Sequence, residues 1–436
     1  MRRLVRAGGT TPGLMLVTGV ALVLVSLLAG LFAVLAVDDR SDAAKSVATG
    51  SEPLGVKTQE IYRALADADA TAAAGLLEGG VESADVRNRY QQAIETASRT
   101  LVQATAAGAT GTVAEQLAVI GVQLPEYARL VERARAETRQ GNTVGAAYLR
   151  SASKNVMRSK ILPAAEALHT MAEKRLAADH RDATSTPWAP LTLLLVSLAA
   201  FGAALWFFAA RTHRRLNIGL VVAVVATVVS VVWLWTGTAS SRDDLDRSRS
   251  DGWGPVETLA QARFLTLQAH GDESLTLVMR GSDNGQYEQD FWDAYGKLVG
   301  VPAENGKPAT VGMLTQAERV SGSDRATLAK IKAAQVAAGE WKTAHSDVMN
   351  LYGNGDFKGA VDRVTKAEGA SRVAFNRIDE ALNAAVAEDQ RDFVHSVAAG
   401  RDSLAGLDVG VGVLALIAAA ATVDGVRREV GRYNRP

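Results

Sequence analysis

The sequence predicts an all-α membrane protein in which four transmembrane helices carry two extracytoplasmic helical domains in tandem duplication. Three observations lead to this fold class. Four apolar runs have the length that an α-helix needs, about 20 residues, to cross a hydrocarbon core. Short arginine-rich segments lie beside these runs. Two long segments between the runs show helical patterns separated by glycine-marked turns.

The middle of the chain predicts a transmembrane hairpin. Residues 189–210 and 218–237 are apolar almost throughout, and the basic loop 211–217 joins them. The alternative, two buried helices of a soluble protein, is disfavoured because such helices would show polar positions at helical spacing. A short basic loop between two spans is expected in the cytoplasm. Its arginines are candidate cytoplasmic interaction residues: Arg211, Arg214 and Arg215.

The two remaining apolar runs lie near the ends of the chain. Residues 13–37 follow a basic tail and predict an uncleaved transmembrane anchor. A cleaved signal peptide is the alternative, although the apolar region of a signal peptide is typically only about 7–15 residues long. Residues 405–423 predict the fourth transmembrane helix, and the tail 424–436 supplies two further candidate interaction residues, Arg427 and Arg428.

The basic segments determine the predicted topology. The tail 1–12, the central loop and the C-terminal tail all carry arginines, so we expect both termini in the cytoplasm. Residues 38–188 and 238–404 then lie outside the cell membrane. None of the cytoplasmic segments is long enough to bury a hydrophobic core of its own. An inward signal therefore requires movement of the helices or a cytoplasmic partner.

The composition argues against an enzyme and against nucleic-acid binding. The formal net charge is +0, so no excess of basic residues favours a polyanionic partner. There are no cysteines, which excludes disulfides, thiolate metal sites and thiol nucleophiles. The six histidines lack ligand spacing, and the sequence contains no phosphate-binding, metalloprotease or nucleophile-elbow motif. We therefore expect no catalytic residues, no metal and no cofactor.

The first outer segment predicts a four-helix bundle of the sensor type. Its helical patterns are separated by glycine-bearing turns and cover residues 56–80, 83–107, 112–139 and 143–188. We expect Pro53-Leu54-Gly55 to interrupt the helix that leaves the membrane, and Pro163 to perturb the fourth helix. Outer helices that continue into the transmembrane helices would couple such a bundle mechanically to the membrane.

The second outer segment repeats this pattern of turns. Gly254-Pro255 corresponds to the Pro-Leu-Gly break, and QGNTVGA at 140–146 aligns with NGDFKGA at 354–360 without a gap. The agreement of turns and apolar runs predicts an internal repeat, with chance agreement of two glycine-bearing turns as the alternative. The copies differ at 301–323, a Gly/Pro-rich insertion that is either a solvated connection or a docking element.

One buried charge pair is predicted in the first outer segment. Asp69 falls within the apolar stripe of its helix, whereas Asp67 points away, and Arg135 falls within the stripe of the third helix. Because a buried carboxylate needs a partner, we expect Asp69 to pair with Arg135. The pair would either fix the helix register or act as a ligand-binding switch, and the alternative is that no pair forms. Asp272 occupies a comparable position in the second copy, but Met349 stands where Arg135 would align.

Three runs of the first outer segment carry a family resemblance: IYRALADADATAAAGLLEGG, RNRYQQAIETAS and LVERARAETRQGNTVGAAYLRSAS. They resemble the GlnX family of actinobacterial four-span membrane proteins, and similar runs occur in a wider set of streptomycete membrane proteins. The resemblance implies two partners, the extracytoplasmic solute-binding lipoprotein GlnH, which recognises acidic amino acids, and the cytoplasmic serine/threonine kinase PknG. No site residues carry over by position.

Together these features predict a non-enzymatic signal-relay protein of the cell membrane. The resemblance implies that the protein reports acidic amino acid availability, through the loaded binding protein, to the kinase. Two alternatives remain: a direct small-molecule sensor with a chemoreceptor-like bundle, and a structural or assembly factor of the cell envelope. Membrane lipid is the expected surrounding, and a homodimer is an open alternative to a monomer. In the expected mechanism, helix four shifts against helix one and displaces the transmembrane helices.

Overall fold

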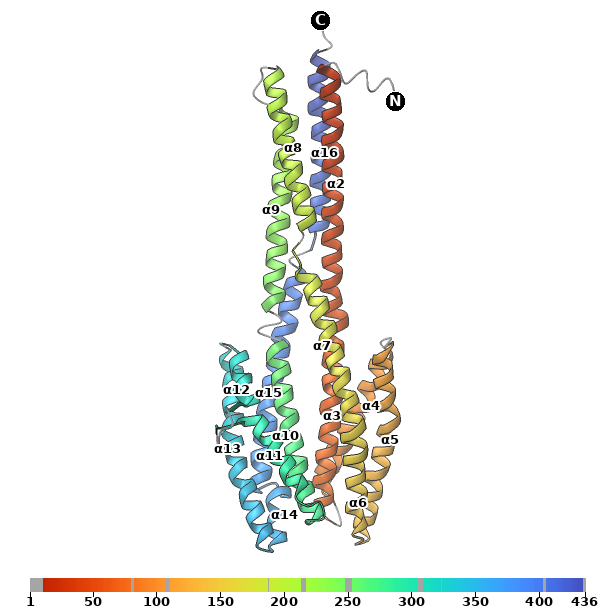
Figure 1. Ribbon diagram of the computed structural model, residues 1–436, viewed down its shortest axis with the longest axis vertical. Helices are drawn as coiled ribbons and strands as arrows, with labels where there is room; N and C mark the ends of the chain where they lie inside the picture. Colours follow the sequence, from red (N-terminus) through yellow and green to blue (C-terminus); the bar gives the residue numbers. More distant parts are fainter. Residues whose placement is uncertain are drawn as a thin grey trace. The chain divides into compact units, whose positions relative to one another are not determined.

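The computed structural model describes residues 11–79, 82–106, 110–186, 188–212, 217–247, 253–303, 309–322, 324–402 and 405–433 (Figure 1). Nearly all of these residues are helical, and the prediction of a helical protein is confirmed. The chain separates into two compact units. Unit 1 combines Met1–Ala48, Ala178–Asp246 and Ser396–Pro436, and unit 2 combines Thr49–Ala177 and Arg247–His395.

The long helices of unit 1 are the predicted apolar ones. They are α2 (Thr11–Ser46), α8 (Trp188–Thr212), α9 (Ile218–Arg247) and α16 (Leu407–Tyr433). α2 packs along α16 and α8. The packing is close because small residues face neighbouring helices: a Cβ on Gly30 would collide with Ala415, and a Cβ on Gly219 with the backbone of α16. Asn217 begins α9 as an N-cap, its side-chain oxygen accepting from the amides of the next turn.

Unit 1 exposes large apolar side chains over most of its surface. Each of the four helices contains a stretch long and apolar enough to cross a membrane, and only 28–33 % of each stretch is buried within the protein. Leu24 is 56 % exposed, Ile218 74 % and Trp206 76 %. Soluble proteins rarely expose contiguous apolar surface of this extent. The four apolar helices are therefore compatible with a membrane protein.

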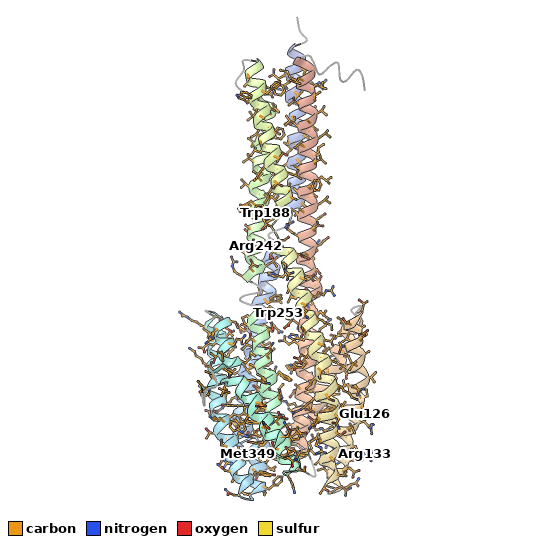
Figure 2. All side chains as sticks on the ribbon, in the orientation of Figure 1. Glu126, Arg133, Trp188, Arg242, Trp253 and Met349 are labelled. Atoms are coloured by element: carbon orange, nitrogen blue, oxygen red, sulfur yellow. The ribbon has the colours of Figure 1, made fainter. Side chains whose placement is uncertain are left out.

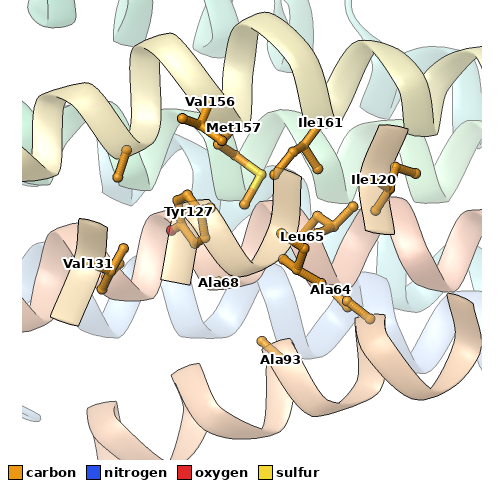
Figure 3. Packing of buried hydrophobic residues seen from close by; sticks show 14 of the residues in the cluster. Ala64, Leu65, Ala68, Ala93, Ile120, Tyr127, Val131, Val156, Met157 and Ile161 are labelled. Carbon is orange, nitrogen blue, oxygen red and sulfur yellow. The ribbon is translucent and has the colours of Figure 1, made fainter. Parts of the chain in front are cut away.

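The first half of unit 2 is a set of helical rods around one hydrophobic cluster. The rods are α3 (Glu52–Leu77), α4 (Ala84–Ala106), α5 (Thr112–Arg139) and the consecutive segments α6 (Val144–Arg150), η2 (Ser151–Ile161) and α7 (Leu162–Thr184). Leu65, Tyr127, Met157 and Ile161 lie at the centre of the cluster (Figure 3). Each rod contributes the apolar stripe of its helical repeat, as the pattern predicted.

The second half of unit 2 contains more and shorter elements. They are α10 (Gly254–Met279), α11 (Gln286–Val299), β1 (Gly300–Val301), β2 (Thr310–Val311), α12 (Met313–Val320), α13 (Arg325–Gly353), α14 (Phe357–Thr365) and α15 (Ala370–Asp402). The antiparallel strands pair Gly300 with Val311. The described part of the insertion at 301–323 includes α12, which buries Leu314 and Ala317 in the core of this half. The expectation of a solvated connection is therefore wrong for α12, because its apolar face packs against α10, α11 and α13.

The two halves of unit 2 meet along α3 and α10, which pack against each other. A Cβ added to Gly271 would lie 3.3 Å from the Cα of Ala70. Side chains cross the boundary in both directions: Ala66 joins the hydrophobic cluster of the second half, and Leu275 and Tyr287 join that of the first. The two predicted outer segments thus contribute to one compact unit, because their first helices present small residues that allow close approach.

Two prolines change the winding of their helices and do not end them. A π-helix, η1 (Val47–Ser51), precedes Pro53, and the eleven-residue π-helix η2 precedes Pro163. Proline lacks the amide hydrogen that would bond the preceding turn, and the wider winding accommodates this loss upstream. The expected perturbation at Pro163 is present, whereas the expected interruption at Pro53 is wrong because helical structure extends from Leu14 to Leu77.

Candidate functional site

The central helices of unit 2 are buried on every side and nevertheless carry charge. α3 is buried from residue 64 to residue 77, and α10 from 269 to 277. Four of the buried side chains are carboxylates: Asp67, Asp69, Asp272 and Glu273. A carboxylate removed from water requires hydrogen bonds, a counter-charge or a proton. The partners of these carboxylates define the candidate site.

Asp69 lies at the centre of a hydrogen-bonded cluster. It accepts from the Tyr127 hydroxyl at 3.3 Å, from Ser153 Oγ at 2.7 Å and from Arg158 Nε at 3.3 Å. The same guanidinium donates from Nη1 to Asp272 Oδ1 at 2.5 Å. One arginine from the first half of unit 2 thereby joins a carboxylate of α3 to a carboxylate of α10.

This cluster contains two carboxylates for one cation. Burial raises the pKa of Asp272 to about 7, although the neighbouring guanidinium of Arg158 acts in the opposite direction. Among the described residues, Asp272 Oδ2 has no hydrogen-bond partner. Burial disfavours the charge of Arg158, but Asp272 and Asp69 outweigh it and raise the arginine pKa. The arginine therefore stays charged, and Asp272 exchanges a proton near neutral pH.

The predicted pair of Asp69 with Arg135 is wrong. Asp69 is buried as expected, but the guanidinium of Arg135 donates to Glu82 Oε1 at 2.8 Å and to Glu132 Oε1 at 2.6 Å. It also lies over the Tyr90 ring, 4.1 Å from the centroid. Glu82 lies in the connection after α3, and Glu132 lies one turn before Arg135 on α5. Arg135 therefore ties the α3–α4 connection to α5.

The partner that the sequence pattern missed lies on a π-helix. Ser153 and Arg158 are five residues apart in η2, and both reach Asp69. In an α-helix, residues at this spacing lie on different faces, whereas hydrogen bonds in a π-helix join residues five apart and bring them to one face. The α-helical repeat therefore does not predict that Ser153 and Arg158 lie on the same face. Pro163, just beyond the π segment, was the available signal of altered winding.

A second charge chain also joins the two halves. Arg89 of α4 donates from Nε to Asp67 Oδ1 at 2.8 Å and from Nη2 to Asp379 Oδ2 at 3.1 Å. Arg263 of α10 donates to the other oxygen of Asp379 at 2.6 Å. Burial disfavours the charged carboxylate of Asp379, but the nearby arginines lower its pKa below the usual value. Asp67, expected to point away from the core, is in fact buried and paired across it.

The second half of unit 2 contains a buried histidine between two carboxylates. His345 Nδ1 lies 2.9 Å from Glu273 Oε1, and its Nε2 lies 3.2 Å from Glu288 Oε1. Ser371 donates to the other oxygen of Glu273 at 2.6 Å. Burial disfavours both charges, but the hydrogen bonds raise the pKa of His345 to about 9 and lower that of Glu273 to about 2. The imidazolium of His345 and the carboxylate of Glu273 therefore form a charged pair in the core.

Two cavities flank a stacked aromatic pair between α3 and α10. Tyr62 and Phe264 stack with ring centroids 4.5 Å apart, and both line each cavity. One cavity, of about 280 Å³, includes Asp69 and Arg158 in its wall, and we call it the Asp69 cavity. The other, of about 570 Å³, is lined by α3, α7, α10 and α15 and includes Arg63, and we call it the Arg63 cavity. The larger volume is within the range of ligand pockets.

The predicted cytoplasmic residues are described only in part. The side chain of Arg211 and the whole of Arg214 and Arg215 lie outside the described residues. Arg427 lines an apolar groove between α2 and α16, and Arg428 forms an exposed ion pair with Asp424. Met349, the residue aligned with Arg135, lies on α13 (Figure 2). Within the described ranges, no cluster of three or more His, Cys, Asp or Glu side chains could hold a metal ion.

One comparison with known proteins covers the part of the Asp69 cluster that lies in the first half of unit 2. No curated protein and no solved structure matches the chain. A family model described as Actinobacterial sensor domain matches residues 43–181, a segment that contains Asp69, Tyr127, Ser153 and Arg158. Together with the four apolar helices, this match supports an actinobacterial sensor protein, and it suggests a sensing role for the domain that holds the Asp69 cluster.

Proposed function

We propose that the protein is a non-enzymatic transmembrane relay in which unit 2 senses an extracytoplasmic state and the apolar helices pass it inward. One observation supports this most directly. Helical structure extends from Leu14 to Leu77, so the chain connects the apolar segment of α2 to the segment carrying Asp69 without an intervening loop. A change in the packing of α3 would reach the apolar segment through this helical connection.

The topology of this proposal follows from charge. Both termini and the loop 211–217 lie in the cytoplasm, because each carries the arginines that favour that side. The helices of unit 2 then lie outside. The cytoplasmic surface is small, and we propose that its arginines contact the downstream partner: Arg211, Arg214, Arg215, Arg427 and Arg428.

We also propose that the chain arose by tandem duplication. In each half an apolar helix precedes a buried helix with a central aspartate, Asp69 in α3 and Asp272 in α10. The two aspartates meet the same guanidinium, that of Arg158. Equivalent helices that pack against each other across a local two-fold relation would produce this arrangement.

The resemblance to the GlnX family suggests the partners. By that resemblance, a solute-binding lipoprotein loaded with an acidic amino acid binds unit 2, and a serine/threonine kinase binds the cytoplasmic arginines.

A second candidate function is direct sensing of a small molecule by unit 2. It is favoured by the Arg63 cavity, whose volume of about 570 Å³ exceeds what a packed helical core leaves empty.

Thiol labelling tests the topology, because the chain has no cysteine of its own. Gln103→Cys lies on the exposed face of α4, and Arg428→Cys lies on α16. In intact cells, a membrane-impermeant maleimide should label only Gln103→Cys, and Arg428→Cys should be labelled only after lysis. Labelling of Arg428→Cys in intact cells would overturn the proposed orientation.

Crosslinking tests the relay itself. Leu65→Cys with Ile161→Cys would tie α3 to η2 within the hydrophobic cluster (Figure 3). Gln123→Cys with Lys160→Cys would tie α5 to η2 and is the matched control, since the native side chains are 3.3 Å apart. Oxidation of the first pair alone should stop the response of the downstream phosphoprotein.

Proteins captured with the uncrosslinked chain from membranes would identify the partner. Recovery of cell-wall enzymes alone would favour an envelope assembly factor.

A further inference from the structure

The wall of the Arg63 cavity contains two opposite charges, Arg63 and Glu60, that are not held by a hydrogen bond or ion pair in the described structure. Arg63 and Glu60 line the cavity from successive turns of α3. Among the described residues, neither side chain makes an ion pair or a hydrogen bond. Residues three apart on a helix face are near enough to pair with each other, and Glu126 with Arg129 on α5 do so at 2.6 Å. The charges of Glu60 and Arg63 are instead both left available to the cavity.

Arg63 is the more exceptional of the two. Burial and the neighbouring Arg263 lower its pKa, although the charges of Asp67, Asp379 and Glu60 act in the opposite direction, and among the described residues no acceptor hydrogen-bonds its guanidinium. Arginine does not release its proton in proteins at ordinary pH, and the charge therefore remains. Arg263 differs, because Asp379 and Asn383 accept its hydrogen bonds at 2.6 Å and 2.7 Å. A partly buried cation without a hydrogen-bonded partner is costly, and an anion entering the cavity would supply that partner.

The rest of the wall is polar on one side and aromatic on the other. His169 lines the cavity, and within the described structure its buried Nδ1 has no hydrogen-bond partner. The amide side chains of Asn383 and Gln390 line it from α15. The stacked Tyr62 and Phe264 form the apolar side. Convergent polar groups beside an aromatic wall are the usual composition of a small-molecule site.

From this arrangement we infer that the Arg63 cavity binds a small zwitterion, with a carboxylate on Arg63 and an ammonium group on Glu60. A free amino acid and a short peptide share this chemistry, and the volume of the cavity accommodates either. A purely anionic ligand would leave Glu60 unpaired next to a second negative charge, and a purely cationic ligand would leave Arg63 unpaired. The inference rests on the proposed function only in making unit 2 the sensing part.

Calorimetric titration of the purified full-length protein in nanodiscs tests the inference with matched probes. The zwitterionic probes are L-alanine and L-alanyl-L-alanine. N-acetyl-alanyl-alanine lacks the ammonium group, and alanyl-alanine amide lacks the carboxylate. Loss of one charge-assisted hydrogen bond should weaken binding about 10-fold or more. The free dipeptide should therefore bind at least about 10-fold more tightly than either blocked form, and comparison with L-alanine separates an amino acid site from a peptide site.

Variants assign each charge to its residue. Arg63→Gln should abolish the preference for the free dipeptide over its amide, and Glu60→Gln should abolish the preference over the N-acetyl form. Glu126→Gln (Glu126 is labelled in Figure 2) and Arg129→Gln, which have the same spacing on the exposed face of α5, should change neither preference. Circular dichroism of each variant verifies that it is folded.

Two results would overturn the inference. The first is that neither L-alanine nor L-alanyl-L-alanine binds at millimolar concentration. The other is equal binding of free and blocked dipeptides by the folded wild-type chain. Both are independent of the proposed relay, since they are measured without a downstream partner. A reversed membrane orientation would remove the relay and leave the binding result unaffected.

Discussion

Asp69 of α3 and Asp272 of α10 share the guanidinium of Arg158, with one oxygen of the first 3.3 Å from Nε and one of the second 2.5 Å from Nη1. The two aspartates are about two hundred residues apart in the chain, and they lie on the two helices through which the halves of unit 2 pack together. The guanidinium therefore neutralises charge on both central helices at once. Removing it would affect both halves together.

Substitution of this arginine should be strongly destabilising. Arg158→Met leaves two buried carboxylates without their cation and should cost about 3–5 kcal/mol of unfolding free energy. Adding Asp272→Asn removes one of the unpaired charges and should recover part of the loss. Denaturant unfolding of the full-length protein, followed by circular dichroism, measures both values. Equal stability of wild type and Arg158→Met would show that the contacts of Arg158 do not contribute to the free energy of unfolding.

Arg135 should couple to Glu82 and not to Asp69. The Arg135–Glu82 pair is largely buried, with side chains 10 % and 6 % exposed. A double-mutant cycle of Arg135→Met with Glu82→Gln should therefore give a coupling energy of about 0.5–3 kcal/mol. The cycle of Arg135→Met with Asp69→Asn should be additive within about 0.5 kcal/mol. Strong coupling in the second cycle would contradict the observed contacts.

Alkaline pH should weaken the second half of unit 2 through His345. The folded-state pKa of His345 is about 9 and the ordinary value is 6.5. Its contribution is thus fully present below pH 6.5 and is lost as the pH rises through about 9. The melting-temperature difference between wild type and His345→Gln should be constant below pH 6.5 and shrink toward pH 9. A difference independent of pH across this window would exclude a buried imidazolium.

Asp272 should produce a separate pH dependence at lower pH. Its pKa is raised from 3.8 to about 7, so its contribution is fully present below pH 3.8 and is lost as the pH rises through about 7. The charged groups facing it are Arg158, Asp69 and Asp290. The stability of wild type relative to Asp272→Asn should therefore fall between pH 4 and pH 7. His345→Gln, measured over the same range below pH 6.5, should keep the wild-type slope.

The close contact of α3 and α10 should not tolerate a larger residue. Gly271→Val places branched carbons where even a Cβ is 3.3 Å from Ala70 Cα, and overpacking should cost about 1–3 kcal/mol. Gly339→Ala is the matched control, because a Cβ there meets nothing within 4 Å on the exposed face of α13. That change should stabilise the helix by about 0.5–1 kcal/mol. Stabilisation by both substitutions would mean that the two helices do not pack closely.

The parts of this protein that depend on local sequence were predictable. Apolar runs and glycine-marked turns are properties of neighbouring residues, and the long helices that they predicted are present. The burial of Asp69 also followed from its place in an α-helical stripe. These predictions needed only the period of an α-helix and the length of a transmembrane segment.

The contacts of the candidate site were not predictable, for two physical reasons. Arg158 and Ser153 share a face only because η2 has π winding, which the α-helical repeat does not detect. Asp272 and Glu273 lie on a helix buried all round, where no polar face marks the direction of a partner. The pairs across the halves also depend on α3 and α10 packing together, which no local pattern specifies.

The π winding of η2 makes the charge cluster sensitive to helix register. If residues 151–161 rewound as an ordinary α-helix, Ser153 and Arg158 would turn to different faces, and Asp69 would lose at least one of its three donors. All residues that follow in α7 would rotate about the helix axis by the same change in winding. The winding of this eleven-residue segment therefore links the hydrogen bonds and protonation of the Asp69 cluster to the rotation of α7 about its helix axis.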